Sequence, residues 1–271
     1  MGTETKIQWT DATWNPWVGC TKVSPACANC YMFDGMHRYG RDPTVVTRTK
    51  PATFRLPLKK HRNGEYVIPP GSKVFTCSWS DWFHVDADPW RSDAWDIIRQ
   101  RPDVTFQIVT KRTDRIAECL PPDWGDGWPN VWLIATAENQ EWIDKRMMDL
   151  LSVPAVVRGL SIEPLLGPVE IGLLGTMPKD ICAGYTLVYE LLSWVIVGVE
   201  SSGQRVGRLG AFFDEIGWMA AAEHIVRECA DADVAVFVKQ IPMSGKICGD
   251  VDQFPPRLRV RQFPETTRAR H

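Results

Sequence analysis

The chain has 271 residues, of which 44% are hydrophobic and 13 are Trp, so it is long and apolar enough to bury a globular core. Its formal net charge of -2 provides no bulk attraction to nucleic acid. It contains no apolar run of about 18 residues, and its start lacks the apolar core of a signal peptide. We therefore expect a cytoplasmic protein that neither crosses a membrane nor is secreted.

Three closely spaced cysteines, Cys20, Cys27 and Cys30, stand near the start of the chain, separated by six and then two residues. A four-iron four-sulfur cluster takes one thiolate per iron, so three cysteines leave the fourth iron open to a small molecule. A closed structural site needs four protein ligands instead. The spacing therefore indicates a metal centre with one open coordination position.

A zinc site is the alternative interpretation of the same thiols. His37 follows Cys30 by seven residues and could supply a fourth ligand from a helix that starts near Ala26. A disulfide is disfavoured, because three clustered cysteines leave one unpaired and the chain does not look secreted. The remaining cysteines stand singly and are expected to be buried small hydrophobes; they are Cys77, Cys119, Cys182, Cys229 and Cys248.

Six short β-branched and aromatic runs follow along the chain, at residues 73–78, 104–110, 131–136, 156–161, 194–198 and 234–238. They are apolar on both faces, as buried parallel strands are. Residues 89–101, 141–151 and 211–230 between them have the apolar spacing of helices. This alternation predicts an α/β fold, wound as a barrel or as a doubly wound sheet. We expect a single domain over residues 1–271, with an insertion or elaborated loop around 167–192.

Charged residues follow all six predicted strands, where functional groups gather in such folds. These residues are Asp81, Lys111, Glu138, Glu163, Glu200 and Lys239. Together they predict a binding site at one mouth of the fold. The alternative is that they form structural ion pairs at its rim.

Positive charge is concentrated in two stretches, either of which could contact phosphates or simply be solvated surface. The first contains Arg48, Lys50, Arg55, Lys59, Lys60 and Arg62, and the second, a basic C-terminal tail, contains Arg257, Arg259, Arg261, Arg268 and Arg270.

Several phrases of this sequence resemble a known family. They are residues 7–16, IQWTDATWNP; 19–31 with the three cysteines; 110–112, TKR; 161–167, SIEPLLG; and 239–240, KQ. They are similar to a phage and prophage family of uncharacterised proteins with a three-cysteine motif. That family is similar to the radical S-adenosylmethionine superfamily and, distantly, to spore photoproduct lyase. In the superfamily the first cysteine interval is usually three residues, whereas here it is six.

The resemblance implies a partial or complete TIM-like β/α barrel. It also implies a 4Fe-4S cluster on Cys20, Cys27 and Cys30, and S-adenosylmethionine bound at the open iron, where reductive cleavage yields a 5'-deoxyadenosyl radical. An electron donor such as flavodoxin or ferredoxin is implied as a partner.

The resemblance also implies roles for the strand-end residues. Ser78, Ser80 and Asp81 correspond to the segment that contacts the methionyl amino group. Lys111 or Arg112 is a candidate for the methionyl carboxylate, and Glu138 and Asn139 for the ribose hydroxyls. Glu163, Glu200 and Lys239 then face the substrate, as candidate catalytic residues.

For the substrate, we hypothesise a thymine-type nucleobase, modified or not, in phage DNA, which the enzyme would rearrange or modify. The rival hypothesis is a non-catalytic, zinc-stabilised phage protein that binds nucleic acid or a host protein. A methyltransferase without a cluster is a weaker third interpretation, because no glycine-rich loop follows a first strand.

Overall fold

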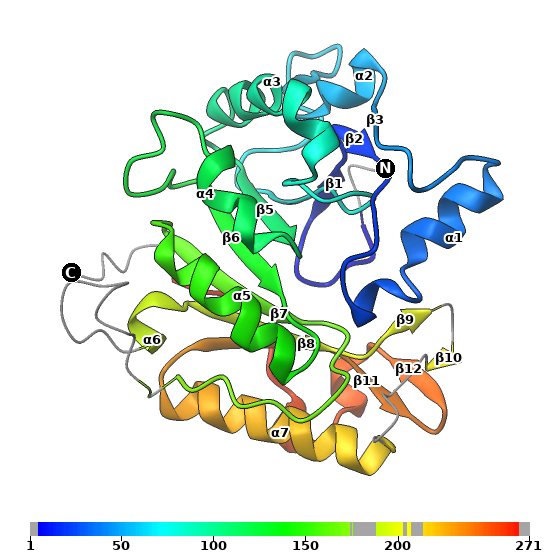
Figure 1. The fold of residues 1–271 in the computed structure, drawn as a ribbon, viewed down its shortest axis with the longest axis vertical. Coiled ribbons are helices and arrows are strands. Elements are labelled where there is room, and N and C mark those ends of the chain that lie inside the picture. The colour runs from blue at the N-terminus through cyan, green and yellow to red at the C-terminus, as the bar shows by residue number, and fades with distance from the viewer. Residues whose placement is uncertain (1–4, 174, 176–187, 203–204, 207–213, 266–271) are drawn as a thin grey trace. The chain divides into compact units, whose positions relative to one another are not determined.

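The computed structural model describes residues 5–173, 175, 188–202, 205–206 and 214–265 (Figure 1). These residues pack into two compact units. The first unit contains residues 5–23, 32–134 and 154–156, and the second contains residues 24–31, 135–153 and the described residues from 157 onward. The chain thus passes from one unit to the other several times, and the expectation of a single domain stays a prediction.

The first unit contains a sheet whose strands stand in the order β1 (Ala12–Trp14), β4 (Lys73–Thr76), β5 (Thr105–Thr110) and β6 (Val131–Thr136), although the last two residues of β6 belong to the second unit. β4 is parallel to both β1 and β5, with Val74 opposite Ala12 on one side and Phe106 on the other. The strands β2 (Trp17–Val18) and β3 (Thr47–Arg48) form a separate antiparallel pair. The helices are α1 (Tyr31–Arg38), α2 (Pro51–Phe54), α3 (Asp88–Arg99) and α4 (Ile116–Cys119).

Tryptophan side chains fill much of the core of the first unit. The ring of Trp82 lies 5.9 Å from that of Trp14 and 4.9 Å from that of Trp95, centroid to centroid. Phe106 of β5 lies 5.8 Å from Trp14 in an edge-on arrangement. Trp95 Nε1 donates to Cys119 O at 2.9 Å, which ties α3 to α4. Such tilted and edge-on pairs stabilise a core by roughly 0.5–1.5 kcal/mol each beyond the burial of their area.

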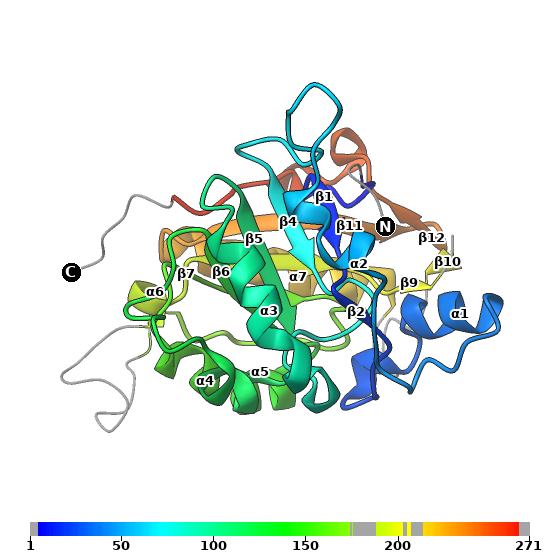
Figure 2. The same ribbon diagram turned by 90° about the horizontal axis from the view of Figure 1, so that it is seen from above.

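The second unit contains three parallel strands in the order β7 (Val157–Ile162), β8 (Trp194–Gly198) and β11 (Ala235–Met243). The sheet continues antiparallel through β12 (Lys246–Cys248), β10 (Arg205–Val206) and β9 (Ser201–Ser202). The helices are α5 (Gln140–Ser152), α6 (Val188–Leu191) and α7 (Glu215–Asp231). α7 packs along β11, as both views show (Figures 1 and 2).

These elements confirm the predicted α/β fold. All six predicted strands and all three predicted helices are present, although β11 continues to Met243 because β12 folds back to pair with it. The helix expected near Ala26 instead begins at Tyr31, after a 3₁₀ turn over Pro25–Cys27. None of the helices in the described residues is both long and apolar enough to span a membrane. Residues 174 and 176–187 of the expected insertion, including Cys182, lie outside the described residues, as do Arg268 and Arg270 of the basic tail.

Candidate functional site

The segment that contains Cys20 is bound to the residues that follow β4 in the first unit. Gly19 N donates to Trp79 O at 3.0 Å, and Ser80 Oγ donates to Gly19 O at 2.5 Å. Gly19 has a φ of +99°, and a Cβ there would stand 2.4 Å from Val45 O. Only glycine fits this close approach of two backbones, so residue 19 determines where the neighbouring thiol lies.

A buried arginine after β5 holds the same segment from the other side. Arg112 Nη1 donates to Cys20 Sγ at 3.5 Å, and its Nη2 donates to Thr21 O at 3.0 Å and to Thr21 Oγ1 at 2.8 Å. His84 Nδ1 accepts from Asp86 N, so the ring proton lies on Nε2, which is 3.1 Å from Thr21 Oγ1. Burial lowers the pKa of His84, as does the nearby guanidinium, and both favour this neutral ring.

Asp81 is the anionic partner of Arg112, at 3.2 Å, and is 4% exposed. Its carboxylate also accepts from Thr110 Oγ1 at 2.7 Å, Lys111 N at 2.9 Å and Phe83 N at 3.0 Å. Burial by itself would raise the pKa of Asp81, but the guanidinium and these hydrogen bonds outweigh it and hold the pKa below its usual value. Asp81 is therefore an ionised and fully engaged group.

The predicted cofactor-binding residues of the first unit thus have protein partners. Ser78 Oγ accepts from Asn15 Nδ2 at 3.0 Å, and Ser80, Asp81 and Arg112 contact the segment around Cys20 directly or through one another. Lys111 contributes its backbone N–H to Asp81. The structure therefore brings these residues together around one of the three thiols.

In the second unit, two buried carboxylates bind the loop that contains Cys27 and Cys30. Glu138, directly after β6, accepts from Ala26 N at 2.9 Å through Oε1 and is 0% exposed. Glu200, after β8, accepts from Asn29 Nδ2 at 3.0 Å through Oε2 and is 5% exposed. These two carboxylates therefore hold the loop on both sides of Cys27.

The charge of Glu138 is balanced by Arg146 from α5. Arg146 Nη1 lies 3.1 Å from Glu138 Oε2 and donates to Thr136 O at 2.7 Å, and both side chains are almost fully buried. The guanidinium also stacks on the Trp142 ring at 4.0 Å. Ion pair, hydrogen bond and stacking together offset the cost of burying two charges.

Glu163, which directly follows β7, and Lys239, which lies in β11, form a mostly buried ion pair. Glu163 packs on Gly198, where a Cβ would stand 3.1 Å from its Cγ. Tyr31 is 46% exposed as a whole residue, but desolvation at its hydroxyl raises the pKa of that group, and Cys30 and Glu163 raise it further. Tyr31 is therefore near Glu163, and Cys30, Glu163 and Lys239 all belong to this unit.

Asn139 caps a helix in the second unit. Its side chain accepts from Trp142 N at 3.2 Å and caps the N-terminus of α5. An Asn in front of a helical pattern signals such a cap, and the predicted contact of Asn139 with the ribose hydroxyls stays a prediction.

His37, the zinc ligand of the alternative interpretation, lies on α1 and is exposed. The pKa of Asp42 is lowered by hydrogen bonds from Thr44 and, to a smaller extent, by His37. The histidine is thus near an acidic side chain of its own unit.

Two residues that take part in these contacts were not predicted from the sequence. Arg146 occupies an ordinary position in an amphipathic helix, and only its burial against Glu138 gives it a role. Asn29 stands between Cys27 and Cys30, so its place in the motif was a usable signal.

A family model described as a protein of unknown function, DUF5131, matches residues 4–250 of the 271. No curated protein matches the chain, and no solved structure does. The match covers most of the chain, and on that basis the protein is a member of the DUF5131 family.

Proposed function

We propose that this protein is a radical S-adenosylmethionine enzyme with a partial or complete β/α barrel and a 4Fe-4S cluster on Cys20, Cys27 and Cys30. One observation supports the proposal most. The cysteine segment is bound by buried charged groups at strand ends in each unit, Arg112 in the first and Glu138 and Glu200 in the second. Cofactor sites of α/β folds lie at the carboxyl ends of parallel strands.

The donor set suits such a cluster. Thiolates are its ligands, and a guanidinium that donates to Cys20 Sγ favours the charged form of that sulfur. The three thiols belong to one stretch of the chain with short intervals, and three ligands leave one iron open. When bound there, the cluster and S-adenosylmethionine supply a radical that removes a hydrogen atom from the substrate.

The residues of this chain would position the reactants. Asp81 and Arg112 orient Cys20 and, with Ser78 and Ser80, keep its segment on the strand ends. Lys111 or Arg112 is the candidate for the methionyl carboxylate, and Glu138 and Asn139 are the candidates for the ribose hydroxyls. In the second unit, Glu163 and Lys239 can hold or pass a proton at the carboxylate or the amine, and Glu200 fixes the loop beside them.

The proposed substrate is a thymine-type nucleobase in DNA. The exposed cations Lys50, Lys59 and Arg62 of the first unit could contact its phosphates. A small electron-transfer protein, such as a flavodoxin or a ferredoxin, would supply the electron in the host cytoplasm.

Anaerobic purification with iron and sulfide analysis, and electron paramagnetic resonance of the reduced protein, tests the proposal. We expect about four irons per chain and a spectrum that changes on adding S-adenosylmethionine. Cys27→Ala should lose both, whereas Cys248→Ala, a half-buried cysteine outside the motif, should keep them. The same preparation, incubated with DNA and reductant, should form an altered nucleoside, detected by mass spectrometry of the digested DNA.

Zinc is the alternative outcome. One zinc per chain without iron, lost in His37→Ala as in Cys27→Ala, would discard the radical mechanism and leave a metal-stabilised binding protein. Cofactor cleavage with every form of DNA and nucleoside unchanged would retain the enzyme class and reject the nucleobase.

A further inference from the structure

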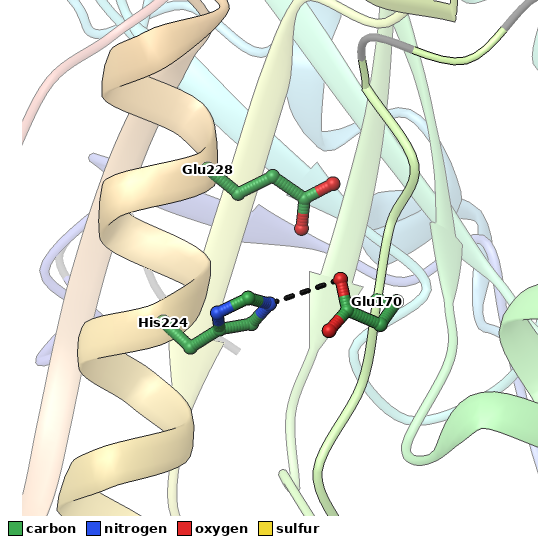
Figure 3. Close-up of side chains that lie close together, drawn as sticks. All are labelled: Glu170, His224 and Glu228. Carbon is green, nitrogen blue, oxygen red and sulfur yellow. Dashed lines mark ion pairs between the residues drawn. The ribbon is translucent and has the colours of Figure 1, made fainter.

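A second group of metal-ligating side chains lies in the second unit and shares no residue with the cysteine motif. His224 and Glu228 stand four residues apart on α7, so they share one face of the helix. Both project toward Glu170 in the segment after β7 (Figure 3). One ligand atom from each of the three lies within 4.8 Å of the other two.

Glu170 is held in place by its backbone. The side-chain amide of Gln140, at the start of α5, clamps it on both sides: Oε1 accepts from Glu170 N at 2.7 Å, and Nε2 donates to Glu170 O at 3.1 Å. This clamp fixes the position from which the Glu170 side chain starts, although that side chain is itself exposed. Such fixing of the backbone lowers the entropy cost of assembling a ligand set.

Glu228 is also oriented by backbone groups. Its Oε1 accepts from Gly172 N at 2.6 Å and Leu173 N at 3.0 Å, and its Oε2 accepts from Ile171 N at 3.1 Å. A carboxylate has about four acceptor sites, so Oε2 keeps one for a further partner. Hydrogen bonds of this kind orient carboxylate ligands in metal sites.

The contact between His224 and Glu170 has the dimensions of two ligands on one ion. His224 Nε2 is buried and has no hydrogen-bond partner among the described residues, yet it lies 3.1 Å from Glu170 Oε2. In a tetrahedral site with bonds of about 2.0–2.1 Å, neighbouring ligand atoms stand about 3.3 Å apart.

We propose that Glu170, His224 and Glu228 bind one divalent transition-metal ion, with Zn²⁺ the best match. An imidazole among the ligands suits zinc, whereas Mg²⁺ and Ca²⁺ take oxygen ligands throughout. Glu170 and His224 also line a cavity of about 500 Å³, so water can occupy the fourth position. The ion would join α7 to the segment after β7.

Titration of the full chain with Zn²⁺, followed by calorimetry, tests this site. Wild type and Cys27→Ala should both bind one equivalent of Zn²⁺ that Mg²⁺ in excess does not displace. His224→Ala and Glu170→Gln should lose that equivalent or bind it at least about tenfold more weakly. Glu223→Gln, a neighbour on α7 that pairs with Arg257 instead, is the matched control and should bind as wild type does.

Thermal unfolding keeps the test independent of any folding defect. Glu170→Gln conserves shape at an exposed position and should melt as wild type does without metal. Zn²⁺ should then raise the midpoint of wild type and not that of Glu170→Gln, because only a bound ion stabilises the native state. Equal Zn²⁺ stoichiometry and equal midpoints in the two proteins would overturn the proposal and leave an ion pair that holds the loop.

Discussion

At the scale of single residues, buried charges hold the segment that contains the cysteines. An ionised group inside a protein is tolerated when it is paired and hydrogen-bonded. Asp81 and Glu138 each have an arginine partner, Arg112 and Arg146. In each case one member of the pair also binds the cysteine segment, at Cys20 or at Ala26. The structural ion pairs of the alternative interpretation are therefore present at Asp81 and Glu138, and the binding mouth stays a prediction.

Asp81→Asn tests this double role. The change leaves Arg112 buried without a counter-charge, so we expect the free energy of unfolding at pH 7 to fall by about 3–5 kcal/mol. Chemical denaturation measures the difference. Asp114→Asn, an exposed site in the same unit, should stay within about 0.5 kcal/mol of wild type.

The effect of Asp81→Asn should depend on pH. The folded pKa of Asp81 is lowered, so its contribution is fully present above the unfolded value of about 3.9 and is lost as pH falls through the folded pKa. The gap between wild type and variant should therefore narrow below about pH 4. A gap that stays constant to pH 3 would contradict the assignment of an ionised Asp81.

At the scale of elements, local capping signals determine where the long helices begin. Asn139 caps α5 by accepting from Trp142 N, and Asp214 caps α7 by accepting from Gly217 N at 2.7 Å. Each cap satisfies an amide that has no partner within its helix. The start of α5 matters for both proposed sites, because α5 supplies Arg146 to Glu138 and Gln140 to Glu170.

Asn139→Ala should lower the free energy of unfolding by about 1 kcal/mol, within a range of about 0.5–2, because one amide at the start of α5 loses its acceptor. Asn139→Asp keeps an acceptor at the cap and should stay close to wild type. Urea denaturation checks both variants. If Asn139→Ala leaves the free energy of unfolding unchanged but weakens the binding of S-adenosylmethionine, the side chain contacts the cofactor and does not stabilise the helix.

At the scale of the whole molecule, neither unit is a continuous piece of chain. The second unit takes residues 24–31 and 135–153 from regions whose flanks belong to the first. The second unit needs both segments. Residues 135–153 contain α5, which buries Ile143 and Leu150, and the 24–31 loop provides Asn29, which donates a hydrogen bond to the buried carboxylate of Glu200. Sequence separation between these parts is large, so the contacts that define the unit are predominantly non-local.

The fragment of residues 157–271 should therefore not fold by itself. We expect no cooperative thermal transition by circular dichroism, in contrast to the full chain. Co-expression with residues 1–156, which supply α5 and the 24–31 loop, should restore the transition. A fragment that melts cooperatively near the midpoint of the full chain would show that its own strands and α7 suffice.

Periodicity in the sequence determined the strands and helices of the α/β fold. Residues 131–136 and 194–198 are apolar on both faces, and they form β6 and β8 at the predicted bounds. β1 was not predicted, because Ala12–Trp14 is only three residues long and depends on its pairing with β4. The 3₁₀ turn at Pro25–Cys27 was not predicted either, because its loop is held by a contact with Glu138, which lies far along the chain.

The sequence by itself therefore determined the class of fold, the strand ends that would be charged and the three thiols that would share one loop. These features follow from local periodicity and spacing, which a linear chain contains directly. Only the tertiary structure decided that Arg112 would contact Cys20, that Glu138 would contact Ala26 and that His224 would meet Glu170. Such contacts join distant parts of the chain, and the packing that buries their charges selects each partner.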